Sequence, residues 1–307
     1  MEFLELAHWL QDPSARTAQQ SAENVKTLEV QMQRPPTGTT VPQKPLWFAF
    51  HQPVPVTSRI LAGFVAWLLF LGLWQYAATA DIAPRRLFPA PTDVIAALYS
   101  LFNENSFHQD VLSSLRRIVI SFSIALAVAL PLGLLMGAFT RVEAFFNPLV
   151  SPFRYLPAPA FIPLLLMWLG TNEGQKIGLL ILGVIWFLTT LIMDHVKNVR
   201  MELIETALTL GANRRQTVSQ VLFRASAPGI VDTCRQMLAV SWTYLVIAEI
   251  VAATDGIGAM MMRARRFVNV DEVMAGILTI GLLGLILDLL FRTLNYLLFP
   301  YLRKATH

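Results

Sequence analysis

A polar and basic segment over residues 194–226 contains acidic and small residues at helical spacing. Glu202 and Glu205 fall in the first turns of a predicted helix, where carboxylates complement the helix dipole. Gly211 is a natural end for that helix because glycine tolerates the left-handed conformation. Asn213 can cap a second helix, with a glutamine at the reciprocal capping position. The pattern predicts a helix–glycine–helix unit, which favours a docking site for another protein.

Ionisable residues within apolar stretches are costly in a membrane and mark either function or pairing. The set comprises Asp232, Arg235, Glu249 and Asp288. Asp232 and Arg235 are three residues apart and can pair on one helix face, which favours a structural role. Glu249 either shapes a gate or pairs with Arg263 or Arg265.

Other polar residues are candidates for contact with a solute. Arg263, Arg265 and Arg266 form a predicted external basic patch, which can draw an anion or contact the acidic surface of a partner protein. Ser241 and Tyr244 can line a pathway, although hydroxyl side chains also hold membrane helices together.

Three prolines, Pro157, Pro159 and Pro163, interrupt one apolar stretch. A broken helix in a membrane can line a pathway, because neighbours satisfy the freed carbonyls. The alternative is a simple kink. We therefore count the three prolines among the pathway candidates.

Composition identifies the surroundings of these residues. The chain has 307 residues, of which 55% are hydrophobic and only 14% charged, against about 25% charged in soluble domains. A membrane span needs about 20 apolar residues. We predict an all-α, polytopic transmembrane bundle of about six spans with a cytoplasmic coupling helix. The predicted spans are approximately 59–79, 118–139, 145–169, 177–193, 228–253 and 273–298.

The sequence suggests two regions. Residues 1–57 form a non-membrane extension that is partly disordered, and residues 58–305 form the membrane domain with its coupling loop over 197–226. The start of the chain is acidic, unlike a signal peptide. Basic residues in the coupling loop favour the cytoplasm for it and for both termini. Arg85 and Arg86 oppose that assignment, as does the basic patch.

Enzymatic chemistry has little support in the sequence. Residues 170–176 resemble a phosphate-binding loop in spacing only. Cys234, the single cysteine, is expected to fill apolar space, and no metal or redox framework is predicted. The formal charge of +4, without basic runs interleaved with aromatics, does not indicate nucleic-acid binding.

The helix–glycine–helix segment resembles a family motif. Permeases of binding-protein-dependent ABC importers carry Glu-Ala-Ala, three residues, Gly, nine residues and Ile-x-Leu-Pro. This chain has Glu205-Thr206-Ala207, then Gly211 and Val221 at the matching positions, and it departs from the motif at Thr206, Phe223 and Arg224. Further segments resemble the nitrate, taurine and sulfonate (bicarbonate) type. They include Ser114-Leu115-Arg116-Arg117, the proline-broken stretch, Ala248-Glu249 and Gly256-Ile257-Gly258.

The resemblance implies a permease subunit in a bacterial-type inner membrane that imports a small solute, such as nitrate, a sulfonate, taurine or bicarbonate. Its implied partners are a second permease subunit, expected to be a second copy, two cytoplasmic ATPase subunits that use ATP and Mg²⁺, and an external solute-binding protein. The implied ATPase contact comprises Glu202, Glu205, Thr206, Ala207, Leu210, Gly211 and Ala212. The alternative is a secondary transporter that couples ions to intramembrane carboxylates, which predicts inverted repeats.

Overall fold

The computed structural model describes residues 54–80, 84, 86–104, 106–252 and 254–301. By its internal contacts the chain divides into two units, Met1–Phe64 and Val65–His307. Every regular element in the described part of the chain is a helix, which confirms the predicted all-α class.

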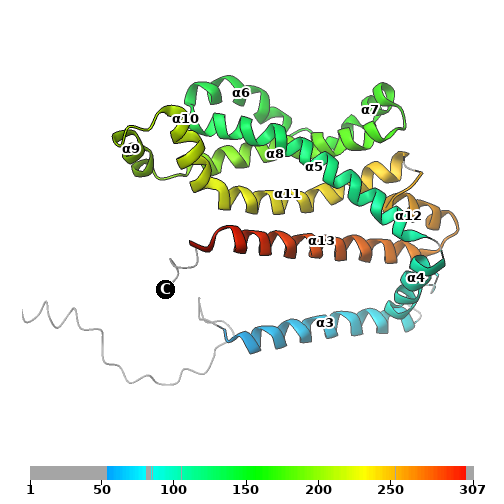
Figure 1. Cartoon of the computed structure of the whole chain (residues 1–307). Coiled ribbons are helices and arrows are strands. Elements are labelled where there is room, and N and C mark those ends of the chain that lie inside the picture. Colours follow the sequence, from blue (N-terminus) through cyan, green and yellow to red (C-terminus); the bar gives the residue numbers. More distant parts are fainter. Residues whose placement is uncertain (1–53, 81–83, 85, 105, 253, 302–307) are drawn as a thin grey trace, which may run out of the picture. The chain divides into compact units, whose positions relative to one another are not determined.

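The first long helix, α3 (Val56–Thr79), begins in the first unit and ends in the second. The elements that follow are α4 (Pro91–Glu104), α5 (Phe107–Ala138), α6 (Thr140–Phe153), η1 (Ala158–Phe161), α7 (Ile162–Leu169), α8 (Glu173–Lys197), α9 (Met201–Thr209), α10 (Arg214–Gln216), η2 (Thr217–Leu222), α11 (Phe223–Ala252), α12 (Ile257–Arg266) and α13 (Val270–Leu298). Figure 1 shows them in chain order.

Five helices are long and apolar enough to cross a membrane: α3, α5, α8, the continuous run Arg214–Ala252, and α13. A sixth candidate is the pair formed by Thr140–Phe153 and Ala158–Leu169, whose halves are bent by 84°. These counts agree with the predicted six spans. The break falls at the predicted prolines because Pro157 and Pro159 cannot donate backbone hydrogen bonds there.

Helix α8 lies at the centre of the second unit and packs against α5 and α11. Its buried side chains include Leu179, Leu180, Leu188 and Ile192. Glycine lets the backbones approach closely, as in many membrane helix pairs. A Cβ added to Gly133 of α5 would lie 2.7 Å from the carbonyl oxygen of Thr189 and 2.9 Å from the Cβ of Ile192.

Contacts along α8 fix the directions of its neighbours. Arg117 of α5 bonds Glu173 near the start of α8, whereas Gly133 touches Ile192 near its end, so α5 and α8 run parallel. His195 Nε2 lies 2.9 Å from the Oγ1 of Thr233 in α11. Because the end of α8 meets the first half of α11, these two helices run antiparallel.

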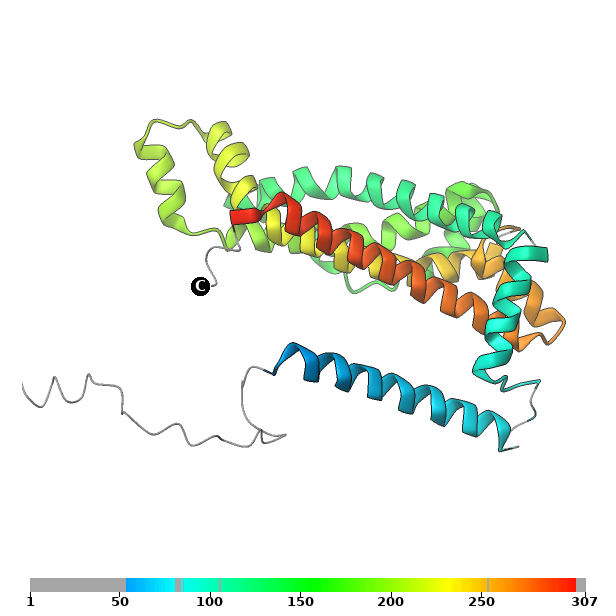
Figure 2. The ribbon, with the colours of Figure 1, turned by 60° about the horizontal axis from the view of Figure 1, so that its bottom comes forward.

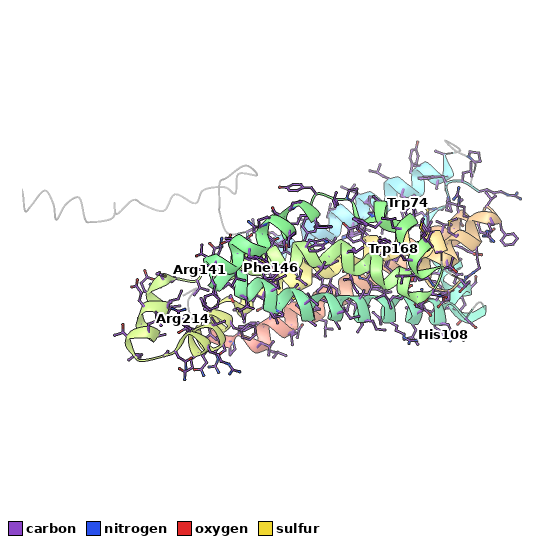
Figure 3. All side chains as sticks on the ribbon, turned by 90° about the horizontal axis from the view of Figure 1, so that it is seen from above. Trp74, His108, Arg141, Phe146, Trp168 and Arg214 are labelled. Carbon is purple, nitrogen blue, oxygen red and sulfur yellow. The ribbon has the colours of Figure 1, made fainter. Side chains whose placement is uncertain are left out.

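Short helices lie at opposite ends of the second unit. Helices α9 and α10 lie at one end, and α4 and α12 lie at the other (Figures 1 and 2). In Figure 3 the labels of Arg214 in α10 and His108 at the start of α5 mark these ends. We call residues 201–222 the knuckle. The region formed by α4, α12 and the start of α5 is called the α12 end.

Two sequence predictions need correction. The second helix of the knuckle is not separate from the fifth span, because residues Arg214–Ala252 form one continuous helix with Pro228 inside it. A single missing amide does not end a membrane helix whose neighbours supply other contacts. The segment between the predicted spans 228–253 and 273–298 is not a simple loop, because it contains α12, with Ile257 and Met260 buried. Helix α4 lies between the first two predicted spans.

The contact at Gly133 predicts a packing effect. Gly133→Ala should lower the free energy of unfolding by about 1–3 kcal/mol, because the added methyl has no space between α5 and α8. The control is Gly281→Ala, since nothing lies within 4 Å of a Cβ there. Thermal unfolding of the detergent-solubilised protein measures both, and equal midpoints for the two variants would contradict this account of the packing.

Candidate functional site

The first helix of the knuckle, α9, is held by local polar contacts. The hydroxyls of Thr206 and Thr209 donate to the carbonyl oxygens of Glu202 and Glu205, at 2.6 and 2.8 Å. The carboxylate of Glu202 accepts hydrogen bonds from its own backbone N–H and from Arg200, which hold its pKa below the usual range. Glu202 is therefore charged at neutral pH, in the helical turn where negative charge is favoured.

Gly211 ends α9 with a φ of +85°, the left-handed region that favours glycine. The N–H of Gly211 donates to the carbonyl of Leu208, and that of Ala212 to the carbonyl of Ala207, both at 3.0 Å. This pair of bonds is the Schellman arrangement, which satisfies the last carbonyls of a helix. The predicted role of Gly211 as the helix stop is confirmed.

Asn213 begins the next helix. Its side chain accepts from the N–H of Gln216, and the Gln216 side chain accepts from the N–H of Asn213, each at 2.9 Å. This confirms the predicted reciprocal cap. The six residues after it, Thr217–Leu222, are π-helical, and the helix then continues into α11. The knuckle is thus joined to a membrane span without a break.

The knuckle presents an exposed surface of mixed character. Leu203, Leu208 and Leu210 are 46%, 50% and 82% exposed, although apolar side chains favour burial. A shallow depression of about 340 Å³ is lined by Glu202, Glu205, Thr206, Thr209 and Leu210. Five of the seven predicted docking residues (Glu202, Glu205, Thr206, Leu210 and Gly211) are exposed, and Ala207 and Ala212 are half-buried.

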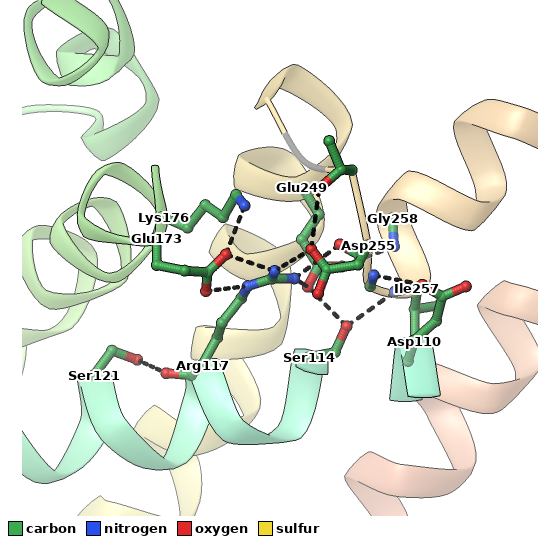
Figure 4. Close-up of polar contacts among 12 residues, drawn as sticks. Asp110, Ser114, Arg117, Ser121, Glu173, Lys176, Glu249, Asp255, Ile257 and Gly258 are labelled. Carbon is green, nitrogen blue, oxygen red and sulfur yellow. Dashed lines mark hydrogen bonds and ion pairs between the residues drawn. The ribbon is translucent and has the colours of Figure 1, made fainter. Parts of the chain in front are cut away.

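A second polar site lies at the α12 end and is centred on Arg117 (Figure 4). The guanidinium is 2% exposed and bonds three carboxylates. Its Nη1 donates to Glu249 at 2.7 Å, and its Nε and Nη2 donate to Glu173 at 2.8 and 2.7 Å. Nη2 also donates to Asp255 at 2.8 Å. One side chain of α5 therefore joins α8, α11 and the connection before α12.

Glu249 is the most enclosed carboxylate of the site, with a side chain that is 0% exposed. It accepts from the hydroxyl of Ser114 at 2.7 Å and from the N–H of Gly258 at 2.8 Å, in addition to Arg117. The backbone of Gly256, with φ +107°, lies against the same carboxylate, where a Cβ would collide with it. Glycine is thus required there by both conformation and space.

Asp255 lies at the outer edge of the arginine site, with a side chain that is 47% exposed. Partial burial raises the pKa of Asp255, but hydrogen bonds from the hydroxyl of Ser113 and the guanidinium of Arg117 outweigh it and leave the pKa below its usual range. A carboxylate with a lowered folded pKa stabilises the protein above its unfolded pKa. That contribution is lost as the pH falls through the lowered value.

Glu249 was expected either to shape a gate or to pair with Arg263 or Arg265, and the structure shows that it forms an ion pair with a different arginine. Its partner is Arg117, not Arg263 or Arg265. Arg263 instead donates to Asp110 at 2.6 Å and to the carbonyl of Thr254. In the sequence, Arg117 is marked only by its family-like segment, because no spacing pattern joins it to Glu249, which is 132 positions away.

Other candidates occupy separate places. The hydroxyl of Ser241 is buried and donates to the carbonyl of Met237, while the ring of Tyr244 packs on Gly183 of α8. Pro157 and Pro163 are exposed and Pro159 is half-buried. Arg265 and Arg266 are exposed at the end of α12.

The predicted pair between Asp232 and Arg235 is confirmed, at 2.8 Å. Arg235 also pairs with Asp288 of α13, at 2.5 Å, and Arg292 bonds the same carboxylate at 2.7 Å. These charges neutralise one another between α11 and α13, which supports the structural role that the spacing indicated.

The arginine site predicts a strong coupling between two distant residues. Arg117→Leu should lower the free energy of unfolding by about 3–5 kcal/mol, because Glu249 is left buried and unpaired. Adding Glu249→Leu should restore part of this loss, since no uncompensated charge remains in the interior. Thermal unfolding of the two single variants and the double variant measures the coupling, and strictly additive effects would show that the pair is not a unit.

Comparison with known proteins places these features in one family. Residues 129–304 match the family model described as binding-protein-dependent transport system inner membrane component. The taurine transport system permease protein of Escherichia coli (strain K12) is 30% identical, over 80% of this chain and 92% of that protein. The nitrate import permease protein of Synechocystis sp. is 24% identical, over 81% of this chain and 92% of that protein.

Solved structures support the same fold. An inward-facing methionine ABC transporter matches with a TM-score of 0.53 at 19% identity, covering 61% of this chain and 95% of the other. A bacterial alginate ABC transporter matches with a TM-score of 0.52 at 16% identity, covering 76% of this chain and 92% of the other. The chain belongs to the family of binding-protein-dependent transport system inner membrane components and is a multi-pass permease subunit of an ABC importer.

Proposed function

We propose that this permease imports a small anion, with a sulfonate, taurine, nitrate or bicarbonate as the candidate class, and that the knuckle is its contact with the ATPase. The observation that carries the coupling role is the knuckle itself. Helix α9 presents an exposed apolar and acidic surface, a Schellman turn ends it, and a capping box begins the helix that follows. The substrate class rests on relatives that transport taurine, aliphatic sulfonates and nitrate.

The knuckle is suited to transmit force because its second helix is continuous with a span. Closure of two ATPase subunits on ATP and Mg²⁺ would move α9, and the Arg214–Ala252 helix would carry that movement through the membrane. The chain itself supplies no phosphate-binding loop, so the hydrolytic step belongs to the partner. In this arrangement the knuckle and both termini face the cytoplasm, residues 58–305 form the permease domain, and residues 1–57 are an extension.

A second permease subunit, which we infer to be another copy of this chain, would cover the broken span. The surface around its bend is apolar and aromatic in the single chain. Tyr155, Met167 and Trp168 are 80%, 78% and 69% exposed. Large exposed aromatic side chains of this kind are typical of the core of protein interfaces.

The alternative, an ion-coupled secondary transporter, would need an intramembrane carboxylate that is free to bind an ion. The carboxylates of Glu249 and Asp288 both form ion pairs with arginine side chains. An ion-coupling role for either residue is therefore not supported by its contacts.

The docking role predicts that changes in the knuckle reduce coupling to the ATPase and leave membrane insertion unchanged. Glu205→Lys should reduce recovery of the ATPase subunit with the permease, and uptake, by about tenfold or more, because it reverses a charge at the interface. Gly211→Pro should have the same effect, since proline cannot adopt a φ of +85°. Copurification and transport assays measure these outcomes, with membrane immunoblots to show insertion.

The control is Asn103→Lys, which adds a positive charge at an exposed position of α4, outside the knuckle. It should leave ATPase recovery within about twofold of the wild type. Normal transport by Glu205→Lys and Gly211→Pro would refute the docking assignment.

The dimer proposal predicts a cross-linking pattern. Met167→Cys should form a linked dimer with a short thiol-specific cross-linker in native membranes, because the surface around the bend faces the second copy. Ile277→Cys, which is 54% exposed on α13, should not. The one native cysteine, Cys234, is buried. Equal cross-linking at both positions, or none at Met167→Cys and at other exposed positions around the bend, would contradict this interface.

A further inference from the structure

Arg154 lies at the break in the bent span, directly after α6 and near the middle of residues 140–169. A charged residue within a membrane segment normally marks function or a paired structural contact. The contacts of Arg154 distinguish between these two possibilities.

No carboxylate in the described part of the chain forms an ion pair with Arg154. Its Nη2 donates to the hydroxyl of Ser151 at 3.2 Å, and its guanidinium carbon lies 5.9 Å from the centre of the Tyr155 ring. The Nε is buried and has no hydrogen-bond partner among the described residues. Arg117 and Arg235, by contrast, each bond two or more carboxylates.

The local backbone supports a cation without neutralising it. The C-terminal end of α6 carries the negative end of a helix dipole, which favours a guanidinium there. The ring of Tyr155 adds a weak cation–π contact. Both partners are neutral overall, so the full positive charge remains available to an incoming anion.

Few other donors exist at the break. Pro157 and Pro159 have no N–H, and the N–H of Ala160 is already bonded to the carbonyl of Pro157. Arg154 is the one charged hydrogen-bond donor in residues 154–161. The exposed ring of Tyr155, which lies against the guanidinium, can contact the apolar part of an organic anion.

We propose that Arg154 is an anion-binding residue of the translocation pathway and selects solutes that carry at least two terminal oxygens on one charged group. Its planar fork can donate two parallel hydrogen bonds to a sulfonate, nitrate or carboxylate, which a lysine cannot do. The absence of a carboxylate partner for Arg154 among the described residues is then explained, because the solute supplies the acceptors. This inference rests on the proposed function, since it requires that the cargo is an anion and that the bend borders the pathway.

The test uses the full transporter, the permease with its ATPase and binding protein, reconstituted in liposomes. Uptake of radiolabelled taurine and nitrate is measured together with ATP hydrolysis. Arg154→Gln should lower anion uptake about tenfold or more, the loss expected for a charge-assisted hydrogen-bonded contact. ATP hydrolysis stimulated by the binding protein should stay within about twofold, so that more ATP is hydrolysed per anion imported. Arg154→Lys should give an intermediate rate.

The matched control is Arg141→Gln, which removes an arginine from the start of the same helix and should leave uptake unchanged. Anion uptake by Arg154→Gln at the wild-type rate would overturn the role of Arg154 and leave the permease function intact. A wild-type complex that imports no anion would overturn the proposed substrate class, and the inference with it.

A second measurement separates charge from structure. In a Cys234→Ser background, Arg154→Cys is treated with methanethiosulfonate reagents that attach either an ammonium or a sulfonate group. The ammonium reagent should restore part of the uptake, the sulfonate reagent should not, and the transported anion should slow both reactions. Failure of the thiol to react, or equal effects of the two reagents, would show that this position does not bind an anion in the pathway.

Discussion

The contact between Arg117 and Glu249 is the constraint on which the α12 end of the permease depends. Both side chains are withdrawn from solvent, and neither could be buried alone without a large loss of hydration energy. Their pairing is completed by Ser114, Gly258 and two further carboxylates, so the donors and acceptors of the site are well matched. Helices α5, α8 and α11, which are separated in sequence, must therefore meet at one point.

That point lies on the same helix as the knuckle. The continuous run Arg214–Ala252 has its reciprocal cap at one end and Glu249 near the other, over roughly 55–60 Å at 1.5 Å per residue. In the proposed coupling, a movement imposed on the knuckle would reach the arginine site through this one helix. The π-helical turn over Thr217–Leu222 is an irregular part of this path, and such turns are frequent at functional sites.

The bent span differs from the tightly packed helices around it. Helices α5, α8 and α11 bury small and apolar side chains against one another. At the break between α6 and η1, by contrast, Tyr155 is exposed and the half-buried Arg154 has no carboxylate partner among the described residues. The family to which the chain belongs moves a solute across a membrane. A segment with an irregular backbone and unpaired hydrogen-bonding groups in one chain is physically suited to contact a second subunit and the transported solute.

The sequence by itself determined the features that depend on neighbours along the chain. The apolar stretches predicted the spans, the prolines predicted the break, and Gly211 with Asn213 predicted the turn and cap of the knuckle, because each depends on a few consecutive residues. Only the tertiary structure decided the partner of Glu249, the pairing of Arg263 with Asp110, and the isolation of Arg154. Those outcomes depend on which helices meet and in which direction. Packing of glycine against the neighbouring backbone, as at Gly133, sets that geometry, and no local pattern of charges encodes it.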